Sequence, residues 1–163
     1  QQASDLPTLL RAEKPLLLLL ENLQDPGNLG TILRTAEGAG VTGVILSKGC
    51  VDLYNPKTIR STMGSVYRVP TLYTEDLRET VELLKAHGIR SFAAHLKGVN
   101  FYDQENYRGG TAFLIGNEGN GLTEELTEQA DTLIRIPMEG KLESLNAGVA
   151  SAILMYEAYR QRR

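Results

Sequence analysis

The stretch "PLLLLL", residues 15–20, decides the fold class. Its five consecutive leucines leave no polar alternation, so both faces of a strand at this position are buried, which is typical of parallel sheets. Short apolar runs recur along the chain and alternate with segments whose apolar residues have helical spacing. This alternation predicts an α/β fold with a mainly parallel sheet flanked by helices.

From this strand to the end of the chain, we predict one domain at residues 15–163. Residues 1–14 are polar, and we expect them to be an irregular linker or N-terminal extension. We expect strands at residues 15–20, 44–46, 67–72, 92–96, 111–115 and 133–136, and helices at residues 29–39, 56–63, 75–87, 123–129 and 145–162.

The composition excludes several classes of protein. The run of five leucines is far shorter than the roughly 20 apolar residues of a membrane span. Cys50 is the single cysteine, which rules out an internal disulfide and favours a reducing compartment, so we expect a cytoplasmic protein. Two histidines and one cysteine argue against a tight zinc site, and we predict no metal. The net charge of −3 argues against a large basic face for nucleic acid.

The first segment with chemical content is "DPGNLGTILRTAEGAG", residues 25–40. It has the glycines of a phosphate-binding turn but lacks the lysine of a phosphate loop. Asn28 is expected at the entrance of a helix, where an N-cap is its structural explanation. Arg34 lies in an otherwise apolar helical pattern. It either forms a structural ion pair or contacts a phosphate or ribose in a cleft.

The second segment is "FLIGNEGNGLT", residues 113–123. A buried strand runs into a loop with three glycines, and ligands of parallel sheets bind where strands end in such loops. Glycines let the backbone approach a ligand closely, although they are equally common in a plain turn before a capped helix. Glu118 is the informative residue, because a carboxylate between glycines has little structural purpose.

The third segment is "IPMEGKLESLNAGVASAILMYEAYR", residues 136–160, where a strand ends in a polar loop before a helix of small residues. Ser144 is a candidate N-cap of that helix. Asn146 is disfavoured in a first helical turn, so its amide could instead form a hydrogen bond across a cleft.

Together, in this order and at these spacings, the segments resemble the SpoU-type (TrmH-like) RNA 2′-O-ribose methyltransferases of the SPOUT superfamily. "DPGNLGTILRTA" is similar to the first family motif, "IGNEGNGL" to the second and "IPMEGKLESLNAGVASAI" to the third. The resemblance spans residues 16 to about 159. It implies that residues 15–163 form a catalytic domain with a C-terminal deep trefoil knot (an alpha/beta knot), and that S-adenosylmethionine is the cofactor.

The resemblance also implies roles for individual residues. The cofactor's adenosyl group would be held by Gly116, Ile136 and Leu145, with Leu96, Met138 and Asn146 as further candidates. The catalytic set would comprise Arg34, Asn28, Glu118, Ser144 and Asn146.

Arg34 would be the central catalytic residue, near the ribose 2′-hydroxyl and the adjacent phosphate. A guanidinium stays charged in proteins, so we favour deprotonation of the hydroxyl by the phosphate, with Arg34 as the orienting group. Its action as the base itself remains the alternative. The other members of the set would position Arg34 and the ribose, and no metal is required.

The expected partners are RNA and a second copy of the chain. The resemblance implies a homodimer in which the first and last helices pack across a two-fold axis and both subunits complete one site. The last helix could supply Ala147, Ala150, Leu154 and Tyr156 to that contact. We also expect an RNA-binding domain upstream of this chain. A local basic patch could contact RNA through Lys14, Arg34, Lys48, Lys57, Arg60 and Arg68.

Ribosomal RNA is the favoured substrate, and transfer RNA is the alternative. A dinucleotide-dependent oxidoreductase would need a G-x-G-x-x-G after the first strand, and "ENLQDPGNLG", residues 21–30, does not fit. A non-catalytic knotted RNA-binding module is the second rival. The presence of the whole predicted catalytic set argues against it.

Overall fold

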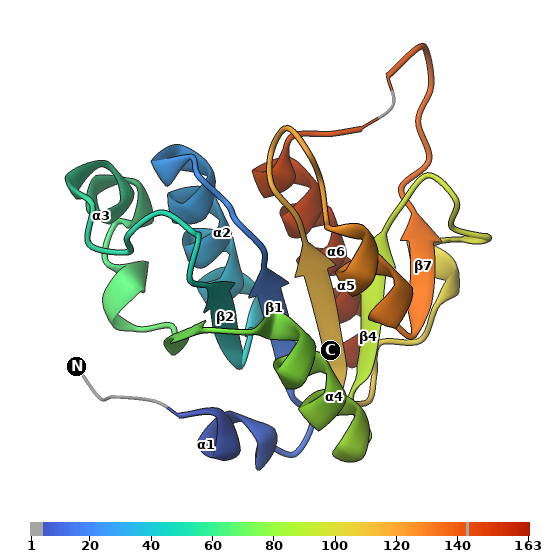
Figure 1. The fold of residues 1–163 in the computed structure, drawn as a ribbon, viewed down its shortest axis with the longest axis horizontal. Helices are drawn as coiled ribbons and strands as arrows, with labels where there is room; N and C mark the ends of the chain where they lie inside the picture. The colour runs from blue at the N-terminus through green and yellow to red at the C-terminus, as the bar shows by residue number, and fades with distance from the viewer. Residues whose placement is uncertain (1–4, 143) are drawn as a thin grey trace.

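The structure of the protein is a computed structural model that describes residues 5–142 and 144–163. Helices and strands alternate along the chain, as the sequence predicts (Figure 1). In chain order the elements are α1 (Leu6–Leu10), β1 (Leu16–Leu20), α2 (Pro26–Ala39), β2 (Gly43–Ser47), α3 (Pro56–Thr62), η1 (Ser65–Tyr67), β3 (Thr71–Thr74), α4 (Leu77–Ala86), β4 (Arg90–Ala94), β5 (Asn100–Phe101), η2 (Tyr102–Gln104), β6 (Thr111–Ile115), α5 (Glu124–Gln129), β7 (Thr132–Arg135) and α6 (Ala147–Arg162).

The seven strands form one sheet in the order β3-β2-β1-β6-β4-β7-β5. Every pair of neighbouring strands is parallel. Strand β1 lies inside the sheet, where Leu18 pairs with Val44 of β2 on one side and Phe113 of β6 on the other. The predicted parallel α/β fold is therefore confirmed, whereas the trefoil knot stays a prediction.

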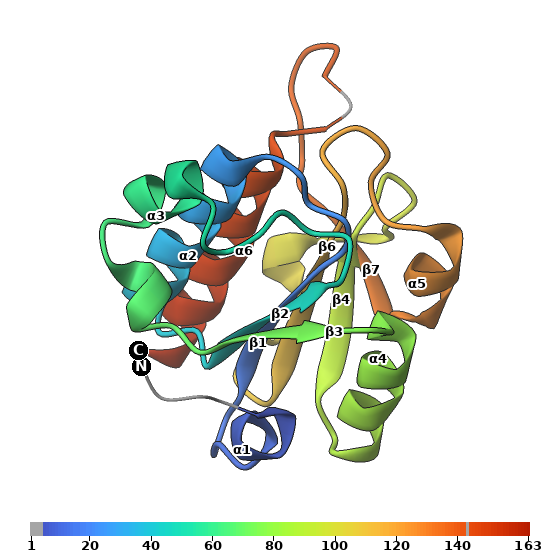
Figure 2. The same ribbon diagram turned by 60° about the vertical axis from the view of Figure 1, so that its left-hand side comes forward.

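Helices cover both faces of the sheet (Figure 2). The leucines at positions 16, 18 and 20 pack into one core cluster with α2 and α6. Those at positions 17 and 19 pack into a second cluster with α1, α4 and α5. Because successive strand residues point to opposite faces, helices on both sides bury all five leucines of β1.

The capping residues correct two predictions about where helices begin. Helix α2 starts at Pro26 because the Asp25 carboxylate accepts a hydrogen bond from the Asn28 backbone N–H at 2.8 Å, so Asn28 is not the N-cap. Helix α6 starts at Ala147 with Asn146 as its N-cap, so Ser144 is not the cap and residue 145 lies before the helix. The end of α2 matches the prediction, because Gly40 closes it with a φ of 74°.

Two local predictions were wrong, and one short strand was missed. Residues 67–72 were expected as a strand, but residues 65–67 form a 3₁₀ turn and β3 starts at Thr71. Val66 and Val69 are both buried at a spacing of three, which suits a turn rather than a strand. No pattern in the sequence predicts the two-residue strand β5. Residues 1–14 were expected to be irregular, but they contain α1, whose Leu9 is buried against Gly43.

The domain boundary at residue 15 remains a prediction. Among the described residues, no helix has the length and apolar character needed to cross a membrane.

Candidate active site

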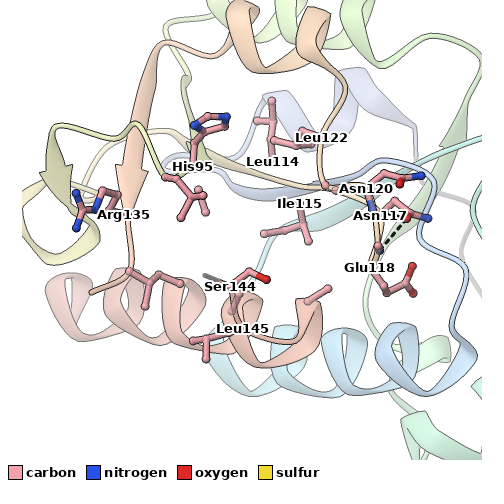
Figure 3. Close-up of a pocket in the computed structure, with 18 of the residues that line it drawn as sticks. His95, Leu114, Ile115, Asn117, Glu118, Asn120, Leu122, Arg135, Ser144 and Leu145 are labelled. Carbon is pink, nitrogen blue, oxygen red and sulfur yellow. Dashed lines mark hydrogen bonds between the residues drawn. The ribbon is translucent and has the colours of Figure 1, made fainter. Parts of the chain in front are cut away.

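A cavity of about 510 Å³ opens where the carboxyl ends of β4, β6 and β7 meet the start of α6 (Figure 3). These three strands are neighbours in the sheet, so the loops that follow them converge at one edge. Apolar side chains dominate the wall, and polar groups from His95, Asn117, Glu118, Arg135 and Ser144 also line it. The volume lies within the range of small-molecule binding sites.

Most of the predicted site residues line this one cavity. They come from three separate loops and comprise Leu96, Gly116, Glu118, Ile136, Met138, Ser144 and Leu145. Asn28, Arg34 and Asn146 are not part of the wall. The structure thus brings the second and third motifs together around a cavity and leaves the first motif beside it.

The loop after β6 is a compact hairpin. Asn117 and Gly121 exchange backbone hydrogen bonds, and the Asn117 side-chain oxygen accepts the N–H groups of Gly119 and Asn120. Gly116 is required for this closure, because a Cβ there would lie 2.2 Å from the Gly121 carbonyl carbon and from the Leu122 nitrogen. The loop therefore offers backbone atoms to the cavity in a fixed arrangement.

Two carboxylates and one amide tie this loop to the turn before α2. Glu118 accepts hydrogen bonds from the backbone N–H groups of Gln24, at 3.0 and 3.1 Å, and Asp25, at 2.6 Å. Glu21 accepts from the backbone and hydroxyl of Thr123, at 2.7 and 2.9 Å. The Asn117 amide donates to the Asn22 carbonyl. We call these contacts between residues 21–25 and 117–123 the brace.

The pKa of Glu118 reflects the brace. Partial burial raises this pKa, but hydrogen bonds from the backbone of Gln24 and Asp25 outweigh that effect, and Asn28 contributes in the same direction. The net result is a lowered pKa, so the carboxylate form is favoured. Glu118 thus positions the entrance of the helix that carries Asn28 and Arg34.

Asn28 and Asn146 meet at the crossing of α2 and α6. A Cβ on Gly148 would lie 3.1 Å from the Asn146 side-chain oxygen and 3.3 Å from that of Asn28. The Asn146 side-chain oxygen accepts hydrogen bonds from the backbone N–H groups of Gly148 and Val149, and these bonds make Asn146 the N-cap of α6. Its side chain forms no hydrogen bond across a cleft to any described residue, since both of its bonds go to its own helix.

The Arg34 side chain is exposed and has no hydrogen bond or ion pair with any described residue. The structural ion pair considered for it is therefore absent from this part of the chain. Gly30 packs against Ser61 of α3, and Gly38 packs against the Tyr156 hydroxyl of α6. Residues 30, 34 and 38 form one helical ridge, so Arg34 lies between the places where α3 and α6 approach α2.

Sequence reasoning missed three residues of this region. Asp25 is the cap of α2, and its position directly before a proline was a usable signal. Glu21 follows β1 at once, but its partner Thr123 lies far along the chain. His95 follows β4 and lines the cavity, with its Nδ1 accepting the Lys97 N–H at 3.0 Å.

The predicted basic patch is smaller than expected. Lys48 pairs with Glu75 at 3.1 Å, and Arg68 pairs with Glu37. Lys14 precedes β1 and so lies at the opposite edge of the sheet from the cavity. Of the other three members, Lys57, Arg60 and Arg34, each is exposed and forms no ion pair with a described residue.

The side chains that α6 can offer to a second copy of the chain differ from those predicted. Leu154 is fully buried in the chain's own core and cannot serve a partner. The large apolar side chains that α6 exposes are Val149, Tyr156 and Tyr159.

Comparison with known proteins gives consistent matches. The model of the SpoU rRNA Methylase family matches residues 15–156. The Bacillus subtilis protein named 23S rRNA (guanosine(2553)-2′-O)-methyltransferase RlmP is 40% identical over 140 residues, which cover 86% of this chain and 56% of that protein. The chain thus spans little more than half of that relative.

Two solved structures have the same fold. The SpoU methyltransferase AviRb from Streptomyces viridochromogenes is 32% identical with a TM-score of 0.90, over 99% of this chain and 65% of that one. An AdoMet-bound rRNA methyltransferase from Sinorhizobium meliloti is 38% identical with a TM-score of 0.87, over 98% of this chain and 61% of that one.

Proposed function

The chain belongs to the SpoU rRNA methylase family, and from this premise we propose that it methylates a ribose 2′-hydroxyl of RNA with S-adenosylmethionine as methyl donor. Ribosomal RNA is the proposed substrate class. The observation that carries the proposal is the cavity lined by the second and third motifs, with the first motif fastened to its rim through Glu118.

The residues of the cavity fit an adenosyl group. Ile136, Met138 and Leu145 supply apolar surface for a flat base, and Gly116 exposes backbone atoms beside them. Polar groups of His95 and Ser144 suit the ribose or the amino-acid part of the cofactor. When bound, S-adenosylmethionine would supply an electrophilic methyl group, so the reaction needs no metal.

The protein's own task is to orient and activate the hydroxyl. We assign Arg34 to this task because its guanidinium is exposed and has no carboxylate partner among the described residues. A guanidinium can bind a phosphate in a fork and hold the neighbouring 2′-hydroxyl for in-line attack, with the phosphate accepting the proton. Asn28 and Glu118 would keep the helix of Arg34 in place. Ser144 and Asn146 would position the ribose and the start of α6.

A second copy of the chain would complete the site. Arg34 does not line the cavity of its own chain, so an Arg34 supplied by a partner is a direct way to bring it there. The exposed apolar side chains of α6 beside α2 support a homodimer contact at this face. The upstream RNA-binding domain, the trefoil knot and a cytoplasmic location remain predictions.

The test is methyl transfer with labelled S-adenosylmethionine and deproteinised ribosomal or transfer RNA, followed by mapping of the modified nucleotide. We expect a 2′-O-methyl group in ribosomal RNA. Label in transfer RNA alone would show that transfer RNA, not ribosomal RNA, is the substrate. If the protein binds the cofactor but labels neither RNA, it would instead be the non-catalytic RNA-binding module. The Arg34→Ala variant is the matched negative control.

A further inference from the structure

Residues 53–74 have a charge pattern unlike the rest of the chain. They hold three of its 17 basic residues, Lys57, Arg60 and Arg68, and none of its 20 acidic residues. The chain as a whole has a net charge of −3. A 22-residue acid-free stretch in such a chain makes a local positive potential that an anionic partner can use.

Two of these positive charges are available on one side of α3. Lys57 and Arg60 are three residues apart, both are exposed, and neither forms an ion pair with a described residue. Arg68 differs, because Glu37 binds its guanidinium, and this contact together with the Ser65 hydroxyl holds the pKa of Glu37 at about 2. The Glu37 carboxylate therefore compensates the positive charge of Arg68.

Apolar and aromatic groups accompany the free charges. Met63 follows Arg60 by three residues and is 67% exposed, and Tyr67 is 56% exposed. The Tyr67 ring and hydroxyl contact no described partner by hydrogen bond or stacking. Tyr73 of the same stretch is structural, since its hydroxyl donates to the Val51 carbonyl and accepts from the Leu53 N–H. We call Lys57, Arg60, Met63 and Tyr67 the α3 surface.

The α3 surface is held firmly beside the first motif. Helices α2 and α3 pack closely, because Gly30 leaves room for Ser61 (Figure 1). The loop that leads to α3 is fastened to the turn before α2, since Val51 donates to the Leu23 carbonyl and the Cys50 sulfur accepts the Leu23 N–H. That turn is the one that the brace fixes, so the α3 surface has a set position relative to Arg34.

We propose that the α3 surface binds single-stranded RNA next to the nucleotide that Arg34 presents. This inference rests on the proposed function, whose substrate it locates on the protein. Lys57 and Arg60 neutralise two phosphates, and an unstacked base packs on Tyr67 with Met63 beside it. Phosphate contacts and stacking carry little base information, so the α3 surface positions RNA without reading its sequence.

The first test is Lys57→Ala with Arg60→Ala in the intact protein. The probe is a fluorescein-labelled single-stranded RNA of mixed sequence and about 20 nucleotides, long enough to cover several binding sites, with anisotropy measured at several salt concentrations. We expect about tenfold weaker binding at low salt and a log–log salt slope that is smaller by about 1.4, or 0.7 for each lost phosphate contact. The dissociation constant for S-adenosylmethionine should not change.

The matched control is Arg11→Ala with Lys14→Ala. It also removes one arginine and one lysine that are exposed and form no ion pair with a described residue, but both precede β1 at the opposite edge of the sheet, so RNA binding should stay within about twofold of wild type. Equal effects of the two double variants, or no effect of either, would overturn the proposal that the α3 surface binds RNA. In the latter case an acidic protein would be the better candidate for its occupant.

A second pair of variants tests stacking. Tyr67→Ala should weaken RNA binding by about fivefold, whereas Tyr67→Phe keeps the ring and should bind as wild type does.

In the methylation assay, Lys57→Ala with Arg60→Ala should raise KM for total ribosomal RNA and leave kcat unchanged. If wild type transfers no methyl group, the proposed function fails and anisotropy still decides the α3 surface. If wild type is active and KM of the variant is normal, the α3 surface alone fails.

Discussion

Loops at residues 116–123 and 136–145 both line the cavity, yet among the described residues only the first is held to other segments by side-chain hydrogen bonds. The brace joins residues 117–123 to residues 21–25, and the loop also bonds to itself. Residues 136–142, 144 and 145 form no side-chain hydrogen bond or ion pair with another described residue. Leu142 in that second loop is 65% exposed.

The difference shows how one cavity can combine a fixed wall with an adaptable one. The braced loop offers its backbone atoms in place before a ligand arrives, so little conformational entropy is lost there on binding. The second loop loses more freedom when a ligand orders it, and apolar contacts of Leu145 and Met138 would offset that loss. Damage to the first loop should therefore distort the cavity and weaken cofactor binding strongly, whereas damage near the second loop should weaken it less, because that loop can adapt.

The largest effect is expected at Arg34, which stands on the braced side but outside the cavity wall. Arg34→Ala should reduce kcat for methyl transfer by about a thousandfold, because it removes the charge that orients the reacting groups. The dissociation constant for S-adenosylmethionine should stay within a few fold of wild type in calorimetry. Arg34→Lys keeps the charge without the fork and should restore only part of the rate. Normal turnover of Arg34→Ala would remove this residue from the mechanism.

The next largest effect is expected at the braced loop itself. Gly116→Ala places a Cβ 2.2 Å from backbone atoms of Gly121 and Leu122, so the hairpin must open. We expect a loss of about 1–3 kcal/mol in the free energy of unfolding and about a hundredfold weaker cofactor binding. Gly119→Ala is the control, since a Cβ there would have only one neighbour within 4 Å, the Asn117 side-chain oxygen at 3.6 Å. Similar behaviour of the two variants would mean that the hairpin does not shape the cavity.

A smaller effect is expected where the unbraced loop enters α6. Asn146→Ala removes the acceptor of two backbone N–H groups and should lower the free energy of unfolding by about 1 kcal/mol. Cofactor affinity and rate should both fall by several fold, because residues 144 and 145 directly precede this cap. Asn146→Asp keeps the cap and should retain stability in chemical denaturation. An unchanged cofactor constant in Asn146→Ala would confine the residue to helix capping.

The smallest effect, and the one that depends on pH, is expected from the brace. Because the folded-state pKa of Glu118 lies below its ordinary value near 4.5, its stabilising contribution is present above that pH and is lost as pH falls through the lowered pKa. Glu118→Gln should cost roughly 0.5–1 kcal/mol at pH 7, since the carboxylate is exposed to solvent. The difference from wild type should shrink toward pH 3 in urea unfolding. A constant difference across this range would mean that the charge has no part in the brace.

The sheet and the cavity could be predicted from local features of the sequence. Five leucines in a row need apolar neighbours on both faces, so positions 16–20 were correctly interpreted as a buried strand. Glycines after a buried strand favour a loop that a ligand can approach, and Gly116 does line a cavity, while its part in cofactor binding stays a prediction. The same logic failed at residues 67–72, because the buried Val66 and Val69 belong to a 3₁₀ turn and the bend that follows it, not to a strand. Short-range patterns cannot separate these cases when apolar runs are brief.

The partners of the site residues could not be predicted, because they depend on contacts between distant segments. Glu118 bonds residues 24 and 25, more than 90 positions earlier, and no spacing rule connects them. Ser144 was expected as the cap of α6, but Asn146 takes that place, since both residue types are good caps and only the backbone decides between them. The absence of Arg34 from the cavity wall likewise depends on how α2 packs against α6.

The central position of β1 has a consequence for biosynthesis. Leu20 pairs with Ile115, about 95 positions later in the chain, so β1 leaves the ribosome long before its β6 neighbour exists. At about 5–20 residues per second, that gap lasts roughly 5–20 s. During this time five adjacent leucines have an open hydrogen-bonding edge. The nascent chain is therefore expected to need shielding by a chaperone until residue 115 has emerged from the exit tunnel.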